Sequence, residues 1–255
     1  MRMKTVVLLA ALVLLAPAVP AVAEGGGNVA EIHIQTPKPG MGPKYQAGRK
    51  KHMGWHKRQK DDWSWTTYEI VTGDRTGSFL TGTFGHDWKD FDAREKMNVA
   101  DDADAEKTMG AALASGSMSY WTVRADLDLA PPVAGPPAKY LVVQHFFVKP
   151  EAVGEFVAGV KKIREAIKKT NWPQKGASRW FQLGNGGAGP HYVLASDRAD
   201  YASMAPPEKP MDAMLEEAYG KEEGAAVMAA TRKTFLSLSS ELLQYRPDLS
   251  YAAPK

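Results

Sequence analysis

Two histidines one helical turn apart, His52 and His56, are the residues of this sequence whose type and spacing best suit chemistry. Side chains at positions i and i+4 of a helix lie on the same face, so both imidazoles would reach one site. Either imidazole can act as a general base near neutral pH, and the two together can also chelate zinc or copper. We therefore treat His52 and His56 as the candidate catalytic residues.

Chelation of a metal by this pair would need a third ligand from the predicted sheet or its loops. The residues considered for that role are His33, Glu69, His86 and Asp87. The zinc motif His-Glu-x-x-His is absent, because Met53 stands where the motif requires Glu. The chain has no cysteine, which excludes thiolate metal sites, iron–sulfur clusters and disulfides. On these grounds the sequence predicts neither a metal nor another cofactor.

The elements that must position the histidines follow the order β-α-β-β-α-β. The predicted strands are 28–35, 65–71, 78–84 and 118–123, and the predicted helices are 44–60 and 88–114. A stretch rich in proline and alanine, 130–138, then predicts a linker. The same order repeats after it, with strands at 140–148, 179–183, 192–195 and 242–245 and helices at 151–169 and 211–236.

Short matching fragments support an internal duplication as well as the order of the elements. Arg124 and Asp126 follow the last strand of the first unit, and Arg246 and Asp248 follow the last strand of the second. Each pair is predicted to form a structural ion pair or a turn, without a catalytic role. The sequence thus divides into a signal peptide (1–23), a first unit (28–129), the linker (130–138) and a second unit (139–255).

With this element order and duplication, residues 28–251 resemble the dimeric α/β-barrel superfamily in a single-chain tandem form. The superfamily includes antibiotic-biosynthesis-type monooxygenases, the chlorite-dismutase and dye-decolorising-peroxidase haem proteins, and small stress-response proteins. The resemblance implies an α+β fold, in which two ferredoxin-like βαββαβ units form a pseudo-dimeric barrel with a cleft between each sheet and its helices. None of the superfamily's catalytic motifs matches, and nothing marks a proximal histidine for haem.

The two halves differ where their first helices should face the sheet. The second-half helix has an apolar stripe of Phe156, Val160, Ile163 and Ile167, and the corresponding first-half positions hold Tyr45, Arg49, His52 and His56. Burial of such polar groups is costly unless they meet hydrogen-bond partners or a ligand, so this contrast predicts a polar cleft. The alternative is a register shifted by one residue, which would turn both histidines toward the edge of the helix.

Aromatic residues are concentrated in the first half, with Trp55, Trp63, Trp65 and Trp88 close together in the sequence. They either fill a core or, with the histidines, form a flat pocket for a small and partly aromatic molecule. The residues predicted to bind this ligand are Tyr45, Arg49, Trp65 and His86.

Three function classes follow from these residues. The main prediction is a protein that binds a small molecule in the cleft of its N-terminal half. The alternative is a cofactor-independent monooxygenase in which His52 or His56 deprotonates a phenolic or enolic substrate, and the third class is a non-catalytic structural or stress-response protein. The sequence leaves open whether the protein is an enzyme.

The N-terminus predicts export. Arg2 and Lys4 precede an apolar run, 6–15, and Ala21 and Ala23 form a small-residue cleavage site, so a signal peptide is expected to be cleaved after Ala23. The secreted or periplasmic product would have no membrane anchor. The formal net charge of +3 is small, which argues against a nucleic-acid partner.

Overall fold

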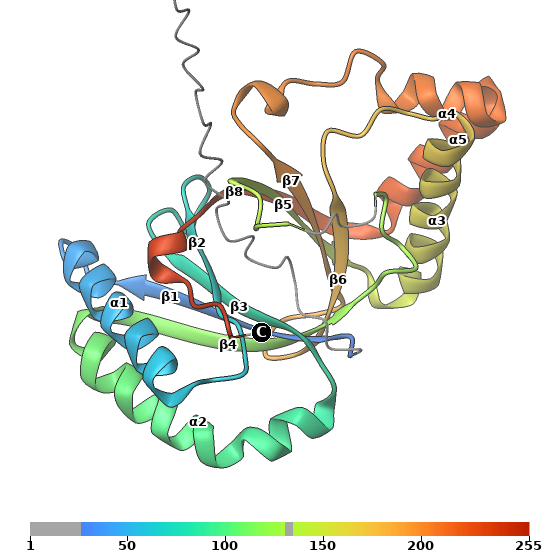
Figure 1. Ribbon diagram of the computed structural model, residues 1–255. Coiled ribbons are helices and arrows are strands. Elements are labelled where there is room, and N and C mark those ends of the chain that lie inside the picture. The colour runs from blue at the N-terminus through green and yellow to red at the C-terminus, as the bar shows by residue number, and fades with distance from the viewer. Residues whose placement is uncertain (1–26, 131–134, 255) are drawn as a thin grey trace, which may run out of the picture.

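The computed structural model of the chain describes residues 27–130 and 135–254, and in them eight strands and five α-helices form one body (Figure 1). The strands are β1 (Val29–Pro37), β2 (Thr66–Ile70), β3 (Phe79–His86), β4 (Leu113–Val123), β5 (Tyr140–Val148), β6 (Ser178–Asn185), β7 (His191–Arg198) and β8 (Phe235–Tyr245). The helices are α1 (Gly42–Gln59), α2 (Trp88–Met109), α3 (Val153–Lys169), α4 (Met211–Tyr219) and α5 (Lys221–Lys233). The predicted signal peptide and residues 131–134 of the predicted linker lie outside the described residues.

All of these strands pair antiparallel and close into a barrel, in the order β1-β3-β2-β8-β5-β7-β6-β4. The first half contributes β4-β1-β3-β2 and the second contributes β8-β5-β7-β6, so each half has the strand order of a ferredoxin-like unit. The halves meet where β2 pairs with β8 and where β4 pairs with β6. The predicted α+β fold, with two tandem units in a pseudo-dimeric barrel, is confirmed.

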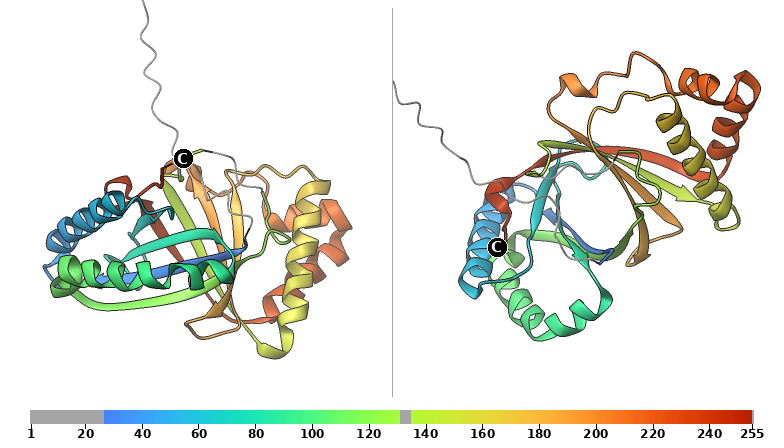
Figure 2. Two further views of the ribbon diagram at one scale, coloured as in Figure 1. Left: turned by 60° about the horizontal axis from the view of Figure 1, so that its bottom comes forward. Right: turned by 45° about the vertical axis from the view of Figure 1, so that its right-hand side comes forward.

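The helices lie outside the ring of strands in two separate layers. Helices α1 and α2 cover the first half, and α3, α4 and α5 cover the second (Figure 2). The second layer rests on an ordinary apolar core, because Phe156, Val160 and Ile167 of α3 are buried as their spacing predicts.

The first helical layer is different, because α1 buries charged and polar side chains. Arg49, His52 and His56 are only 4%, 2% and 1% exposed, and α2 buries only Arg94 and Met109 among its residues. The predicted register of α1 is therefore right, and the alternative register with both histidines at the edge is wrong. Such a layer needs polar partners for these buried groups in addition to its apolar contacts.

Strands β4 and β8 and the last predicted helix differ most from the sequence prediction, each for an identifiable reason. Strands β4 and β8 begin at Leu113 and Phe235, earlier than predicted, since their exposed first residues still pair with β1 and β5 although their hydrophobic alternation is weak. The helix predicted over 211–236 is interrupted by Gly220, whose φ of +86° is disfavoured for residues with a Cβ atom.

Strand β1 separates two cavities, because successive side chains of a strand point to opposite faces. Ile32 and Ile34 face the barrel interior and line an apolar cavity of about 240 Å³. Glu31, His33 and Gln35 face α1 and α2 and line a polar cavity of about 160 Å³. The polar cavity is the feature of the fold that the candidate site uses.

Within the described ranges 27–130 and 135–254, none of the helices combines the length and the hydropathy that crossing a bilayer requires.

Candidate functional site

The polar cavity lies between helices α1 and α2 and the outer face of the first-half strands. Arg49, His52 and His56 line it from α1, Asp101 lines it from α2, and His33 lines it from β1. Its wall therefore combines imidazole, guanidinium and carboxylate groups.

The end of α1 places a carboxylate behind His56. Lys60 ends the helix in the left-handed conformation, at φ +54°, so the chain turns back and the Asp61 N–H donates to the His56 carbonyl oxygen at 3.1 Å. This turn brings the buried Asp61 side chain to the same histidine, where Oδ2 accepts the Nδ1–H of His56 at 2.7 Å. The carboxylate thereby fixes both the orientation and the tautomer of the ring.

Asp61 is the centre of a buried polar network. Its two oxygens accept hydrogen bonds from both terminal nitrogens of Arg94, at 2.6 and 2.7 Å. One of these oxygens also accepts a hydrogen bond from the Trp65 indole N–H at 3.1 Å. Burial alone would raise the pKa of Asp61, but hydrogen bonds from His56, Arg94 and the Trp63 N–H hold it well below its usual range. Asp61 is therefore a permanent anion that holds the end of α1 against α2.

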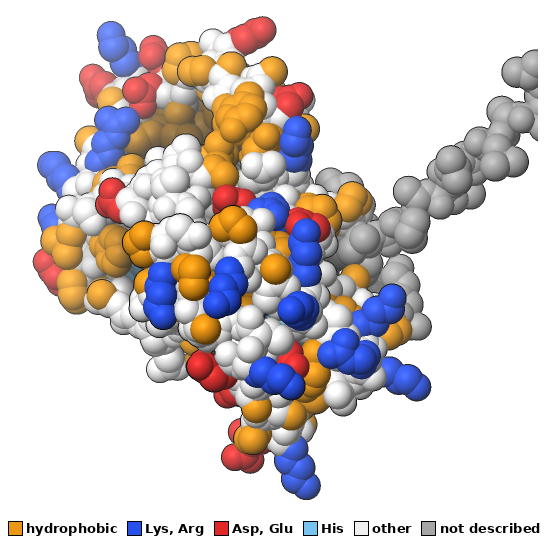
Figure 3. Space-filling view, turned by 90° about the vertical axis from the view of Figure 1, so that its left-hand side faces the viewer, with side chains coloured by type: hydrophobic (Ala, Val, Ile, Leu, Met, Phe, Trp, Pro, Cys, Tyr) orange, Lys and Arg blue, Asp and Glu red, His pale blue; other side chains and the backbone are white. Residues whose placement is uncertain are grey.

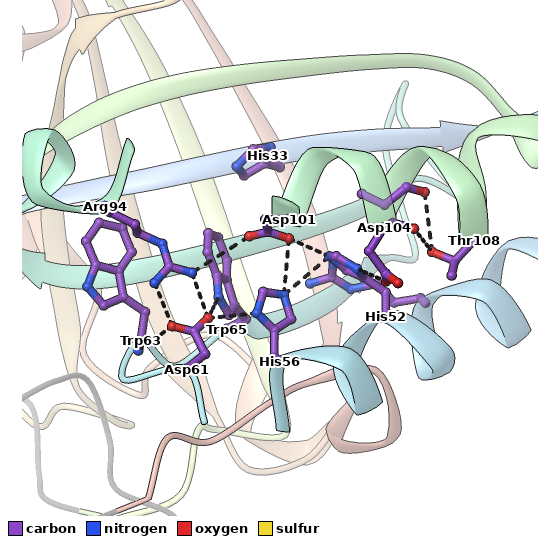
Figure 4. A network of polar contacts seen from close by, with 12 residues as sticks. His33, His52, His56, Asp61, Trp63, Trp65, Arg94, Asp101, Asp104 and Thr108 are labelled. Carbon is purple, nitrogen blue, oxygen red and sulfur yellow. Dashed lines mark hydrogen bonds and ion pairs between the residues drawn. The ribbon is translucent and has the colours of Figure 1, made fainter. Parts of the chain in front are cut away.

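His52 is oriented in the same way by a different carboxylate. Its Nδ1 atom lies 2.9 Å from Asp104 Oδ2, and its Nε2 atom lies 3.0 Å from Asp101 Oδ1. The Nε2 atoms of His52 and His56 are 3.3 Å apart, and His56 Nε2 lies 3.5 Å from the same Asp101 oxygen. Two imidazole nitrogens and one carboxylate oxygen thus converge on one point (Figure 4).

Electrostatics keep these groups in the forms that such a site needs. Burial lowers the pKa of His56, and this effect outweighs the contact with Asp61, so the ring is neutral near pH 7. For Asp101, burial acts to raise the pKa, but the hydrogen bond with His52 and the nearby positive charges lower it overall. The convergence point is therefore formed by a neutral imidazole and a carboxylate anion, with the second imidazole beside them.

The remaining polar wall has capacity for a ligand. Arg49 donates to Thr67 Oγ1 and to the Leu249 carbonyl oxygen, and both contacts are long, at 3.4 Å. A guanidinium has five N–H donors, so Arg49 retains donors for an anionic or hydroxyl group. On β1, His33 Nε2 lies 2.6 Å from Glu31 Oε1, which leaves its Nδ1 atom available.

Four of the six residues predicted for the site line this cavity: Arg49, His52, His56 and Trp65. Tyr45 does not, because its ring packs on Phe79 in a core cluster, although its hydroxyl donates to the cavity residue Gln35 at 2.7 Å. His86 does not line it either. Its Nε2 atom is 2.7 Å from Thr83 Oγ1 and its ring stacks on Trp63, so it belongs to the packing beyond the cavity.

The acidic partners of the histidines, namely Asp61, Asp101 and Asp104, were not predicted from the sequence, and neither was Arg94. The nearest carboxylate to both Nε2 atoms comes from helix α2, and not from the sheet residues that were considered as a third ligand. The sequence did hold a sign of these partners: Arg94 and Asp101 are seven residues apart, so both charges lie on one face of the helix. That face is apolar in the second half, where Met214, Leu215 and Val227 are buried.

The outer face of α1 is basic, in contrast to its buried face. Lys50, Lys51 and Lys57 are exposed, and Lys and Arg side chains are spread over this side of the molecule (Figure 3). The polar residues of α1 thus fall into two groups, a solvated basic face and a buried stripe of Arg49, His52 and His56.

No protein-family model matches the sequence, and neither does any curated protein. Among solved structures, similar folds include a proposed monooxygenase from Lactobacillus acidophilus, with a TM-score of 0.54 and 10% identity over 89% of this chain and 97% of the other. An anthrone oxidase-like protein has a TM-score of 0.56 and 15% identity over 92% of this chain and 97% of the other. A chlorite dismutase variant from Candidatus Nitrospira defluvii, in complex with cyanide, has a TM-score of 0.54 and 8% identity over 89% and 93%. At these identities the likeness establishes the dimeric α/β-barrel fold.

The polar cavity does not fit haem, the group that the resemblance to the haem branches implies. An engineered cavity of about 150 Å³ accommodates a single benzene ring. The cavity here has about the same volume, 160 Å³, whereas a porphyrin contains four pyrrole rings. We therefore derive no step from haem.

Proposed function

We propose that the protein is an oxidoreductase of monooxygenase type that acts on a small phenolic or enolic molecule in the polar cavity. The observation that carries the proposal is the arrangement of His52 and His56. Each Nδ1 atom is held by a carboxylate, each Nε2 atom points toward the other ring and Asp101, and all three residues line the same cavity.

This arrangement suits removal of a proton from a substrate hydroxyl. A neutral imidazole accepts the proton at Nε2, and the carboxylate behind it stabilises the imidazolium that forms. The resulting substrate anion is electron-rich and reacts more readily with O₂. When the ring C–H para to a phenolic hydroxyl becomes a carbonyl, one atom of O₂ enters the quinone product and the other leaves as water with the C–H and O–H hydrogens, so no external reductant is required.

The size and lining of the cavity indicate the substrate class. A volume near 160 Å³ fits one ring and its substituents. Trp65 and Tyr120 supply aromatic surface for the ring, and Arg49 supplies donors for an oxygen substituent. A single-ring hydroxyaromatic or enolic compound meets all three conditions.

The comparisons are secondary support for this reaction class. Two of the similar structures are described as a proposed monooxygenase and an anthrone oxidase-like protein, and they share the fold with this chain. Since one fold hosts many activities, the residues of the cavity remain the main support.

The test is binding and turnover with a panel of single-ring phenols and hydroxyaromatic acids. We expect at least one compound to raise the melting temperature of the protein and to cause O₂ consumption, and His52→Ala and His56→Ala to lose both effects. His86→Ala is the matched control, because it removes a first-half histidine that lies outside the cavity, and it should keep the ligand-induced shift.

The other two function classes correspond to distinct outcomes of this experiment. A histidine-dependent thermal shift without O₂ consumption would favour a small-molecule-binding protein. The absence of any shift across the panel would favour a structural or stress-response role and would contradict the proposal.

We also propose that the protein is exported, to the periplasm or beyond the cell. The support is the sequence alone, namely the basic N-terminus, the apolar run 6–15 and the small residues before Glu24. The mass of the protein recovered from an exporting host should correspond to a chain that begins at Glu24, and an intact Met1 would contradict export with cleavage.

A further inference from the structure

We infer that His52, His56 and Asp101 bind a divalent first-row transition metal ion, with one coordination position open to the polar cavity. The inference rests on the proposed function only in placing the substrate in the same cavity. Nothing in the fold comparison assigns a metal to these residues, which are brought together from α1 and α2.

The hydrogen-bond pattern behind the histidines is the first argument. Asp104 and Asp61 accept the Nδ1–H groups of His52 and His56, so in the neutral rings both Nε2 atoms carry lone pairs. The two Nε2 atoms lie 3.3 Å apart, and both also lie close to an oxygen of Asp101. Three such atoms repel one another unless a proton or a metal ion lies among them, and the geometry offers one position from which a single metal ion reaches all three. A carboxylate behind each imidazole is also the usual second shell of metal-binding histidines.

The distances among the three atoms are the second argument. Separations of 3.0, 3.3 and 3.5 Å place them on a circle with a radius of about 1.9 Å, close to the metal–nitrogen and metal–oxygen distances of about 2.0–2.2 Å found in zinc sites. An ion at bonding distance from all three atoms would lie slightly out of their plane. No movement of the backbone is needed to form the site.

The balance of charge is the third argument. The carboxylates that line the cavity or orient its histidines are Glu31, Asp61, Asp101, Asp102 and Asp104. The cations near the same groups are Arg49, which lines the cavity, and Arg94, which is hydrogen-bonded to Asp61. Negative charge is therefore in excess around nearly buried imidazoles, and a divalent cation would compensate most of it.

The donor set indicates the class of metal. Calcium and magnesium prefer oxygen ligands, whereas two imidazoles and one carboxylate suit zinc and its first-row neighbours. Three protein ligands with an open position are typical of catalytic and not of structural sites. A metal ion here would lower the pKa of a bound substrate hydroxyl, so the imidazoles would serve as ligands and the ion would take over their role in deprotonation.

The first experiment compares Asp101→Asn with Asp102→Asn in chelator-treated protein titrated with Zn²⁺ by calorimetry. The two residues are adjacent in α2 and both line the cavity, but only Asp101 contacts the histidines. We expect one Zn²⁺ per chain, a loss of affinity of more than about tenfold for Asp101→Asn, and near-native affinity for Asp102→Asn. Absence of stoichiometric binding, or equal losses in both variants, would overturn the inference.

The second experiment uses the unaltered protein loaded with Co²⁺. Two exchangeable, strongly shifted proton signals are expected in the NMR spectrum, one from each Nδ1–H held by Asp61 and Asp104. A spectrum without such signals would refute ligation by both histidines.

Failure of the metal inference is distinguishable from failure of the proposed function. A protein that binds no Zn²⁺ but still shows the histidine-dependent ligand shift would overturn only the metal site. A protein that binds Zn²⁺ but neither binds nor oxidises any compound of the panel would keep the site and contradict the proposed substrate class.

Discussion

Replacement of Asp61 by Asn tests whether the buried network behind His56 holds the first helical layer in place. The substitution keeps the shape of the side chain and removes its charge, so Arg94 loses a bidentate partner with contacts of 2.6 and 2.7 Å while both groups are buried. Removing one partner of a buried ion pair typically costs about 3–5 kcal/mol. For a chain of this size, that loss corresponds to a melting temperature lower by on the order of 10 °C.

The assay is urea unfolding followed by tryptophan fluorescence, since Trp63 and Trp65 lie against the network. Asp62→Asn is the matched control. The Asp62 side chain also pairs with Arg94, but it is 89% exposed and the contact is long, at 3.7 Å, so loss of its charge should cost less than about 0.5 kcal/mol. A double variant, Asp61→Asn with Arg94→Met, should lose less stability than the two single losses added together, because it no longer buries an unpaired charge. Equal stability of Asp61→Asn and Asp62→Asn would refute this account of the network.

Two further substitutions test other parts of the structure. Burial raises the pKa of Glu241, but contacts with His145 and Arg75 outweigh it and lower the pKa from 4.5 to about 2. The ionised form is thus favoured by folding, and this contribution, at most about 3 kcal/mol, is fully present above pH 4.5 and is lost as the pH falls toward 2. Glu241→Gln should therefore lower stability at pH 7 and flatten the pH dependence of urea unfolding between pH 5 and 2.5; an unchanged slope would contradict the assignment. In α1, a Cβ atom at Gly48 would lie 2.2 Å from a backbone oxygen of α2, so Gly48→Ala should destabilise the protein by about 1–3 kcal/mol and weaken Zn²⁺ binding by separating the helices. Gly54→Ala is the control, because its Cβ atom would meet only the flexible Arg58 side chain at 3.4 Å, so it should leave urea stability and Zn²⁺ binding unchanged or slightly improved. Equal effects of the two glycine variants would contradict close packing of α1 on α2.

The polar stripe of α1 could be predicted because the chain contains its own reference. The second-half helix shows which positions face the sheet, and this register placed Arg49, His52 and His56 in buried positions that the structure confirms. Local periodicity was sufficient, since all of these residues belong to one helix. The same internal comparison supported the two Arg–Asp pairs, which the structure forms with nearly the same geometry after β4 and after β8.

The partners of the stripe could not be predicted in the same way. Asp101 and Asp104 meet the histidines only because α2 packs beside α1, and Asp61 does so only because Lys60 adopts a left-handed turn. Contacts between separate elements and backbone turns at non-glycine residues leave little trace in hydrophobic periodicity. His86 was assigned to the site because it follows a strand that borders the cleft, but its position in space is set by Thr83 and Trp63.

Closure of the barrel within a single chain has a consequence for symmetry. A ring assembled from two identical subunits must present two identical clefts, because every residue occurs twice about the twofold axis. Here the strands that would join two subunits, β2 with β8 and β4 with β6, belong to one polypeptide, so the two clefts are free to differ. One cleft holds buried charged and polar side chains around the polar cavity, whereas its counterpart is filled by apolar side chains such as Phe156 and Trp180. Covalent linkage of the halves thus frees the protein from twofold equivalence, and the polar cavity is built from first-half residues alone.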